Sequence, residues 1–207
     1  MAEPGTQQRD GADGHPGPAL GAALLVRARN AIAAEFGEAP QPEPAQPRLD
    51  EPGATFVTLT QHGELRGCIG SLEAWRPLDT DIRANARAAA FRDPRFPPLA
   101  REELPATCVE VSLLTPAEPI AFADEADALR QLRPGIDGVI FECGGRRATF
   151  LPQVWESLPE PNLFLAHLKR KAGFAPDFWA DGVKLHRYGV RKWKESKTTC
   201  GAVAELD

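Results

Sequence analysis

Apolar residues recur along this chain with two periods, one typical of helices and the other typical of strands. The helical stripes end at glycines or prolines, which are the usual stops, and one stripe begins directly after a proline. A proline-rich connector at 38–53 offers little to bury and is expected to be extended. The pattern predicts helices over residues 19–36, 78–91, 124–132 and 162–174.

Shorter runs alternate between apolar and polar residues, or are apolar throughout, and are bounded by turn residues. They predict strands over residues 54–60, 64–70, 107–115, 138–143, 146–151 and 183–193. Two hairpins with long helices between them indicate an α+β fold of mostly antiparallel sheets with flanking helices.

The first hairpin admits two registers. A two-residue loop at 62–63 places Leu59 opposite Arg66, whereas a three-residue loop beside a bulge pairs Leu59 with Leu65. We favour the second register because it gathers the apolar side chains of both strands on one face. In either register Arg66 and Cys68 share a face, because strand side chains alternate.

The second hairpin turns at Gly144-Gly145. A two-residue loop there places Glu142 opposite Arg147 and Phe141 opposite Ala148, which is a consistent pairing on both faces.

Charge and cysteine content limit the classes of function. A net charge of −5 argues against broad binding to nucleic acid. The basic run at 184–197 is the local exception, and such a run is usually a solvated strand edge. The four cysteines are widely spaced, with no C-x-x-C motif or zinc spacing, so we expect no metal site and no cofactor.

The chain termini look like tails outside the folded part. Residues 1–18 contain neither the basic nor the apolar segment of a secretory signal, so we expect a disordered tail and a cytoplasmic protein with reduced thiols. Residues 196–207 are expected to form a flexible tail. No apolar run approaches the length of a membrane-spanning helix.

Six motifs occur in a fixed order and carry a resemblance to a known family. They are LRGCIGSL, NARAAAFRDPRFPPL, EVSLLTP, RPGIDGVIF, TFLPQVWE and FLAHLKRKAG. Together they resemble the AMMECR domain family, whose bacterial members are called AmmeMemoRadiSam system protein A. The resemblance implies a domain over residues 19–195 with two lobes around a cleft. It also implies a Memo-like protein and a radical SAM protein as partners, without supplying an established reaction.

Cys68 is the candidate nucleophile, with Arg66 as a nearby cation that could favour the thiolate. The alternative is a small buried side chain that only packs. A partner base is harder to find: His167 is the best of the histidines, because His62 lies in a turn. Glu110 is the candidate acid–base group, or else the anionic partner of a nearby cation.

Other polar residues of the motifs are candidate ligand contacts. Asp93 and Arg95 flank a proline in a turn, where they could bind a polar ligand or cap backbone amides. The cations among the candidates favour a carboxylate or phosphate as the ligand group. The predicted ligand-binding residues are Arg66, Asp93, Arg95, Ser112, Thr149, Gln153 and Lys171, and Arg147 adds to the positive charge.

Three classes of function therefore remain: an enzyme acting through Cys68, a noncatalytic module that presents a ligand or a protein segment to its partners, and a nucleic-acid binder. The net acidity makes the third the weakest. The sequence does not decide between the first two.

Overall fold

The computed structural model describes residues 17–196, and the predicted tails lie outside this range except for their innermost residues. The chain divides into two compact units, in agreement with the two expected lobes. Of the described residues, unit 1 contains 17–113 together with 192–196, and unit 2 contains Leu114–Arg191. Each unit is built around its own four-stranded antiparallel sheet. The cleft expected between the lobes stays a prediction.

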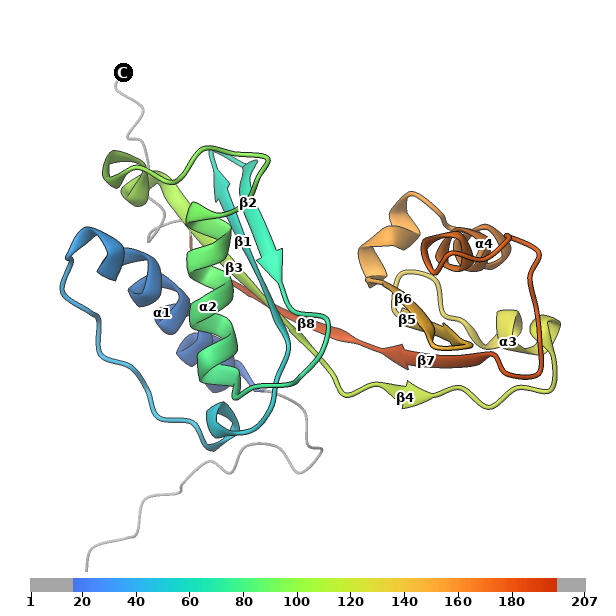
Figure 1. Ribbon diagram of the computed structural model, residues 1–207. Helices are drawn as coiled ribbons and strands as arrows, with labels where there is room; N and C mark the ends of the chain where they lie inside the picture. Colours follow the sequence, from blue (N-terminus) through green and yellow to red (C-terminus); the bar gives the residue numbers. More distant parts are fainter. Residues whose placement is uncertain (1–16, 197–207) are drawn as a thin grey trace, which may run out of the picture. The chain divides into compact units, whose positions relative to one another are not determined.

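Unit 1 is a sheet with two helices on one face (Figure 1). Its strand order is β2-β1-β3-β8, so that β2 and β8 are the edge strands. The core forms where the apolar stripes of the helices pack on Val57 and Leu59 of β1 and on Val109, Val111 and Leu113 of β3. The elements are α1 (Pro18–Ala33), β1 (Thr55–Gln61), β2 (Glu64–Gly70), α2 (Leu78–Phe91), β3 (Thr107–Leu114) and β8 (Val190–Lys194).

The helix boundaries in unit 1 follow the local signals. α2 spans the predicted residues, and α1 continues into a short 3-10 turn, η1 (Ala34–Phe36). Gly37 ends this turn in the left-handed conformation with φ +73°, as its place in the sequence predicts. Further 3-10 turns are η2 (Pro47–Asp50) and η3 (Arg101–Ala106).

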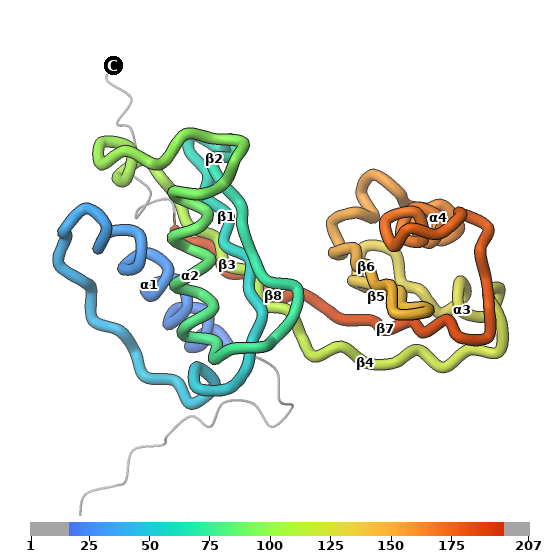
Figure 2. Tube along the Cα trace, viewed as in Figure 1, coloured from blue at the N-terminus to red at the C-terminus, as the bar shows by residue number. Residues whose placement is uncertain are grey.

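The proline-rich connector 38–53 returns the chain from α1 to β1 (Figure 2). It is better anchored than its composition suggests, because the Asn30 side chain of α1 exchanges two hydrogen bonds with the backbone of Gln41. Glu43 also pairs with Arg83 of α2. The prediction of an extended segment therefore holds for most of its length, while its attachment to the helices was not foreseen.

The register of the first hairpin differs from the one favoured above. The loop has two residues, 62–63, and a β-bulge interrupts the ladder at Leu59/Thr60. Because of the bulge, Arg66 has no residue opposite it in β1, and Leu59 lies opposite Gly67 instead of Leu65. Leu65 is 43% exposed, so the apolar grouping that favoured the other register is wrong.

The bulge also separates Arg66 from Cys68, which the alternation of side chains had placed on one face. Arg66 contacts Glu103, which also contacts Gln61 on the helix-covered side of the sheet. The Cys68 sulfur instead contacts Thr58, on the opposite face. A single extra residue in β2 reverses the alternation at this point and explains the difference.

Unit 2 consists of a second sheet with helices packed on one of its faces (Figure 1). The strand order is β4-β7-β5-β6. Among residues 17–196, no helix is both long and apolar enough to cross a membrane. The elements of unit 2 are β4 (Glu118–Pro119), α3 (Glu125–Gln131), β5 (Gly138–Cys143), β6 (Arg146–Phe150), η4 (Pro152–Glu156), α4 (Pro161–Lys171) and β7 (Lys184–Tyr188).

The second hairpin confirms the predicted register. Glu142 lies opposite Arg147 and Phe141 opposite Ala148, around a two-residue turn at 144–145. The strand predicted over 183–193, in contrast, is interrupted, because β7 and β8 belong to different sheets.

Candidate functional site

The backbone of Cys68 faces away from the rest of the sheet. Antiparallel pairs alternate between hydrogen-bonded and non-hydrogen-bonded types. The bond from the Ser71 N–H to the Thr55 carbonyl, at 2.8 Å, marks that pair as hydrogen-bonded. Three residues along, Thr58 and Cys68 therefore form a non-hydrogen-bonded pair, in which the N–H and C=O groups of Cys68 point away from β1. Because β2 is an edge strand, the N–H and C=O groups of Cys68 have no strand to bond on their outer side.

Two side chains from the turn after α2 bond these groups instead. Asp93 Oδ2 accepts the Cys68 N–H at 2.8 Å, and Arg95 Nη2 donates to the Cys68 carbonyl at 3.2 Å. The carboxylate and the guanidinium thus replace the acceptor and the donor of a neighbouring strand. We call this arrangement the edge clamp. It occupies the outward N–H and C=O groups of Cys68, which on an unprotected edge strand could pair with another chain.

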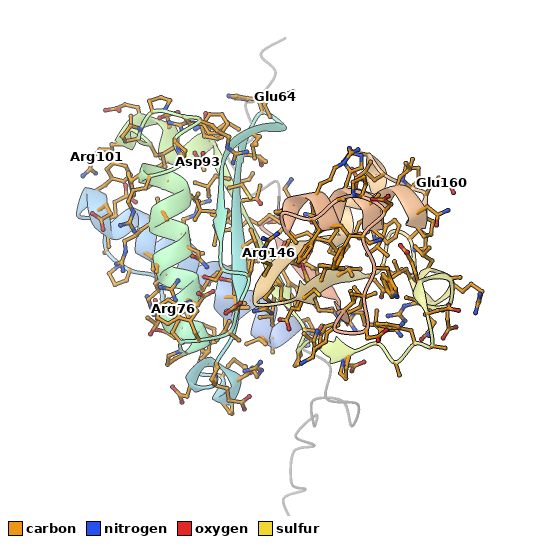
Figure 3. The ribbon with its side chains drawn as sticks, turned by 45° about the vertical axis from the view of Figure 1, so that its right-hand side comes forward. Glu64, Arg76, Asp93, Arg101, Arg146 and Glu160 are labelled. Atoms are coloured by element: carbon orange, nitrogen blue, oxygen red, sulfur yellow. The ribbon has the colours of Figure 1, made fainter. Side chains whose placement is uncertain are left out.

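The two members of the edge clamp are paired with each other. Arg95 donates to Asp93 through Nε at 2.9 Å and through Nη2 at 2.6 Å. Asp93 is only 4% exposed, and it lies just beyond the end of α2 (Figure 3). The hydrogen bond from Arg95 lowers the pKa of Asp93 well below its usual range, and the Cys68 amide acts in the same direction against the effect of burial. These contacts correspond to the capping alternative for Asp93 and Arg95.

The Cys68 side chain lies in a row of three polar side chains across β2, β1 and β3. Thr58 Oγ1 donates to Cys68 Sγ at 3.3 Å, and Thr58 lies opposite both Cys68 and Glu110. We call Cys68, Thr58 and Glu110 the thiol row. All three are partly exposed, and Cys68 is a free cysteine. Ser112 follows on the same face of β3 but is buried.

Arg66 has a different set of partners. Its Nε and Nη2 bind the two carboxylate oxygens of Glu103 at 2.8 and 3.0 Å. Glu103 also accepts from Gln61 and from the backbone of Ala100. Arg66 is the main cause of the lowered pKa of Glu103, about 2. The third guanidinium nitrogen of Arg66, Nη1, is buried without a hydrogen-bond acceptor among the described residues.

A Cys–His pair does not form within unit 1. Of the histidines that the structure describes, only His62 belongs to this unit, and it is exposed in the turn between β1 and β2. His167 and His186 belong to unit 2, in α4 and β7. Glu110 shares the face of Cys68 two strands away, with Thr58 between them, and it stays the candidate acid–base group.

Two of the candidates in unit 2 lie together. Lys171 Nζ donates to the Thr149 carbonyl at 3.0 Å, with the ammonium group 5.2 Å from the centre of the Phe150 ring. The Thr149 hydroxyl is within hydrogen-bond distance of the Tyr188 hydroxyl, at 2.9 Å. Burial raises the pKa of Tyr188. Gln153 is exposed on η4.

A buried polar cluster around Asp81 was not among the predicted residues. Asp81 is fully buried and accepts hydrogen bonds from Thr55, Ser71, Arg76 and Asn85. The cluster ties the start of β1 and the segment after β2 to α2. Asp81 and Asn85 are four residues apart and adjoin the apolar stripe of the helix, which is the signal that could have revealed them.

The described cysteines differ in state. Cys68 and Cys143 are free, whereas Cys108 is disulfide-bonded, so the expectation of reduced thiols is wrong for Cys108. Among residues 17–196 no group of three or more histidine, cysteine or carboxylate side chains is arranged to hold a metal ion.

The basic run of the C-terminal segment falls on β7 and β8. Its cations Lys192 and Lys194 are exposed on an edge strand, as expected for edge protection. Its one acid, Glu195, forms an ion pair with Arg29 of α1 and accepts the Val109 N–H. The carboxylate of the run thus fastens β8 to unit 1.

Comparison with known proteins shows one family. Residues 25–193 match the family model described as AMMECR1. The chain is 43% identical over 155 residues to Protein MJ0810 of Methanocaldococcus jannaschii, which covers 71% of this chain and 75% of that protein. It is 37% identical over 195 residues to Protein Mbar_A1807 of Methanosarcina barkeri, which covers 89% and 94%.

A solved structure has the same fold. The crystal structure of the uncharacterized protein PH0010 from Pyrococcus horikoshii matches with a TM-score of 0.68 and 35% sequence identity. The match covers 83% of this chain and 89% of that one.

Proposed function

Since this chain belongs to the AMMECR1 family, we propose that it is a binding module that holds a small polar ligand against the thiol row of unit 1. One observation carries the proposal: both backbone groups of Cys68 are held by the edge clamp, while its sulfur accepts from the Thr58 hydroxyl and stays partly exposed. A side chain on a fixed backbone loses little freedom on binding, which is what a preorganised ligand contact requires.

The chemistry of the row indicates the kind of ligand. Glu110 offers a carboxylate acceptor, Thr58 a hydroxyl and Cys68 a thiol, so the ligand would carry at least one hydrogen-bond donor. The candidate cations of unit 1 are already paired with carboxylates, Arg66 with Glu103 and Arg95 with Asp93. The proposal is therefore a polar ligand, and an anionic group is not required at this face.

Covalent chemistry is the more specific form of this proposal. In it, Cys68 would be the nucleophile and Glu110 the acid–base group, with Thr58 between them. Alkylation of Cys68 by neutral iodoacetamide across pH, followed by peptide mass spectrometry, tests this form. A rate that persists below pH 7 supports a nucleophile, and an inert thiol contradicts it.

Ligand carry-over tests the binding proposal directly. Small molecules released by denaturing the purified full-length chain are identified by mass spectrometry, for the wild type and for Cys68→Ser and Glu110→Gln. We expect one compound in near-stoichiometric amount in the wild type, reduced in both variants and retained in the control Glu156→Gln, at an exposed position of unit 2. If the wild type carries no compound, and no compound in a panel of polar metabolites raises its melting temperature, the binding proposal fails.

The proposed partners are a Memo-like protein and a radical SAM protein, in accordance with the family resemblance. Retention of both proteins on the tagged chain, in lysate of a cell that encodes all three, is the expected result. Retention of neither at near-native expression would contradict this part of the proposal and leave the ligand proposal standing.

A further inference from the structure

A pocket of about 330 Å³ lies at the turn of the β5–β6 hairpin, and all its described lining residues belong to unit 2. Its lining includes the turn residues Gly144 and Gly145, both with positive φ. Apart from the adjoining residues, no atom in the described part of the chain lies within 4 Å of the position that a Cβ would take at either glycine. The backbone of the turn is therefore open to a ligand. The volume lies near the lower end of the range for small-molecule sites, roughly 300 to 1,000 Å³.

Three cationic side chains line this pocket against one carboxylate. The cations are Arg146, Arg147 and Lys184, and the carboxylate is Glu142. Glu142 lies opposite Arg147 in β6 and opposite Lys184 in β7, and it forms an ion pair with Arg147 at 2.8 Å. Among the described residues that line the pocket, three positive charges therefore face one negative charge.

Both guanidinium groups are held in place, whereas the ammonium group is free. Arg146 donates to the Gly173 carbonyl at 2.7 Å and lies 4.9 Å from the centre of the Phe174 ring. These contacts use only some of the five N–H donors of an arginine. Lys184 is exposed and has no side-chain hydrogen bond or ion pair with another residue in the described part of the chain.

We propose that this pocket binds a small oxyanion, a phosphate or carboxylate group, between Arg146, Arg147 and Lys184. Arginine and lysine side chains bind such groups through charge-assisted hydrogen bonds, and a fixed guanidinium loses little conformational entropy in doing so. The open glycine turn lets the anion approach the backbone closely. The site is separate from the proposed ligand contact in unit 1, so either can fail without the other.

Cys143 provides a reporter inside the pocket, because it lines the cavity as a free cysteine. The full-length chain is treated with neutral iodoacetamide while inorganic phosphate is increased at constant ionic strength, and each cysteine-containing peptide is followed by mass spectrometry. We expect Cys143 alkylation to slow along a saturating curve, about tenfold at a phosphate concentration about ten times the Kd. Cys68 in unit 1 is the internal control and keeps its rate.

Lys184→Gln is the test variant, since the exposed side chain can change without loss of a described contact. It should weaken the protection of Cys143 by phosphate, whereas Arg130→Gln on α3 should not. Arg130 is exposed, and within residues 17–196 its ion pair is with Asp127 of its own helix. Acetate in place of phosphate distinguishes the two ligand groups: protection by either supports an oxyanion site, and the stronger of the two identifies the group.

A second measurement does not depend on any variant. In the wild type, phosphate should shift the NMR amide signals of Gly144 and Gly145 with the same saturation as the alkylation. Absence of saturable protection and of these shifts would overturn the proposal, and so would equal protection of Cys68 and Cys143, which would indicate a general salt effect.

Discussion

The two hairpins of this protein close with the same kind of turn but differ in the strands that follow. The turn of β1–β2 has φ +51° at His62 and +88° at Gly63, and that of β5–β6 has +53° at Gly144 and +77° at Gly145. The β5–β6 ladder then continues without interruption, whereas the β1–β2 ladder is shifted by a bulge after two pairs. The turn alone therefore does not determine how a hairpin presents its side chains.

The consequence is a different use of charge in the two units. In β5–β6, regular pairing places Glu142 directly opposite Arg147, and the two form an ion pair across the strands. In β1–β2, the bulge directs Arg66 to Glu103 on the helix-covered face and leaves Cys68 beside Thr58 on the other face. The extra residue in β2 thus places the ion pair of Arg66 on one face of the sheet and the proposed ligand contact at Cys68 on the other.

The largest expected effect comes from removing the Asp81 carboxylate of α2, which holds the start of β1 and the segment after β2 together. Asp81→Ala leaves Arg76 and several polar groups without their buried partner, so we expect a loss of about 3–5 kcal/mol in the free energy of unfolding. Urea unfolding measures it, with hydrogen exchange to show that β1 and β2 open while β5 and β6 stay protected.

Asp50→Ala is the matched control for this change, because Asp50 is exposed in unit 1. It should change the free energy of unfolding by no more than about 0.5 kcal/mol. If Asp81→Ala has an equally small effect, the buried cluster does not hold the hairpin.

Alanine substitution of one glycine in each hairpin should have the next largest effect on stability, and the cost should differ between the two hairpins. A Cβ on Gly67 would lie 2.2 Å from the Ala89 carbonyl oxygen of α2, so Gly67→Ala should cost about 2 kcal/mol or more. Gly145 faces open space, and Gly145→Ala should cost only the strain of positive φ, about 1 kcal/mol. Thermal or urea unfolding of both variants gives the ranking, and the reverse order would contradict the close contact of β2 with α2.

Acid should weaken unit 1 through Glu103, with a smaller effect. Its pKa in the folded chain is about 2, below the ordinary 4.5, because Arg66 stabilises the carboxylate. Its contribution to stability is complete above pH 4.5 and is lost as the pH falls towards 2. In urea unfolding at several pH values, Glu103→Gln should be less stable than the wild type at neutral pH, and the difference should shrink between pH 4.5 and 2. A constant difference across this range would exclude the role given to the ion pair.

Local signals were sufficient for much of the fold. The helix over 78–91 was predicted from its proline start and apolar spacing, and the register of β5–β6 from a turn that made both faces consistent. The family was recognised from motifs in the correct order, which the match over residues 25–193 confirms.

The remaining features depend on contacts that no local pattern encodes. The bulge at Arg66 is stabilised by Glu103, 37 residues away, and the edge clamp joins Cys68 to a turn 25 residues later. Similarly, the strand predicted over 183–193 continues through Gly189 in the sequence, although its two halves enter different sheets. The sequence therefore named most of the polar residues in the candidate site but could not say which of them pair with one another.

Hydrogen exchange at the Cys68 amide tests the central claim, that the edge clamp fixes Cys68 on an otherwise unpaired strand edge. In the wild type, NMR should show this outward N–H to be protected, because Asp93 accepts it at 2.8 Å. In Asp93→Ala it should exchange about tenfold faster or more, since a hydrogen bond to a charged acceptor contributes about 1.5–3 kcal/mol. Arg95→Gln, which keeps the acceptor, should have a smaller effect, and β5 amides should be unchanged in both variants. A Cys68 amide that exchanges equally fast in the wild type and in Asp93→Ala would contradict the account.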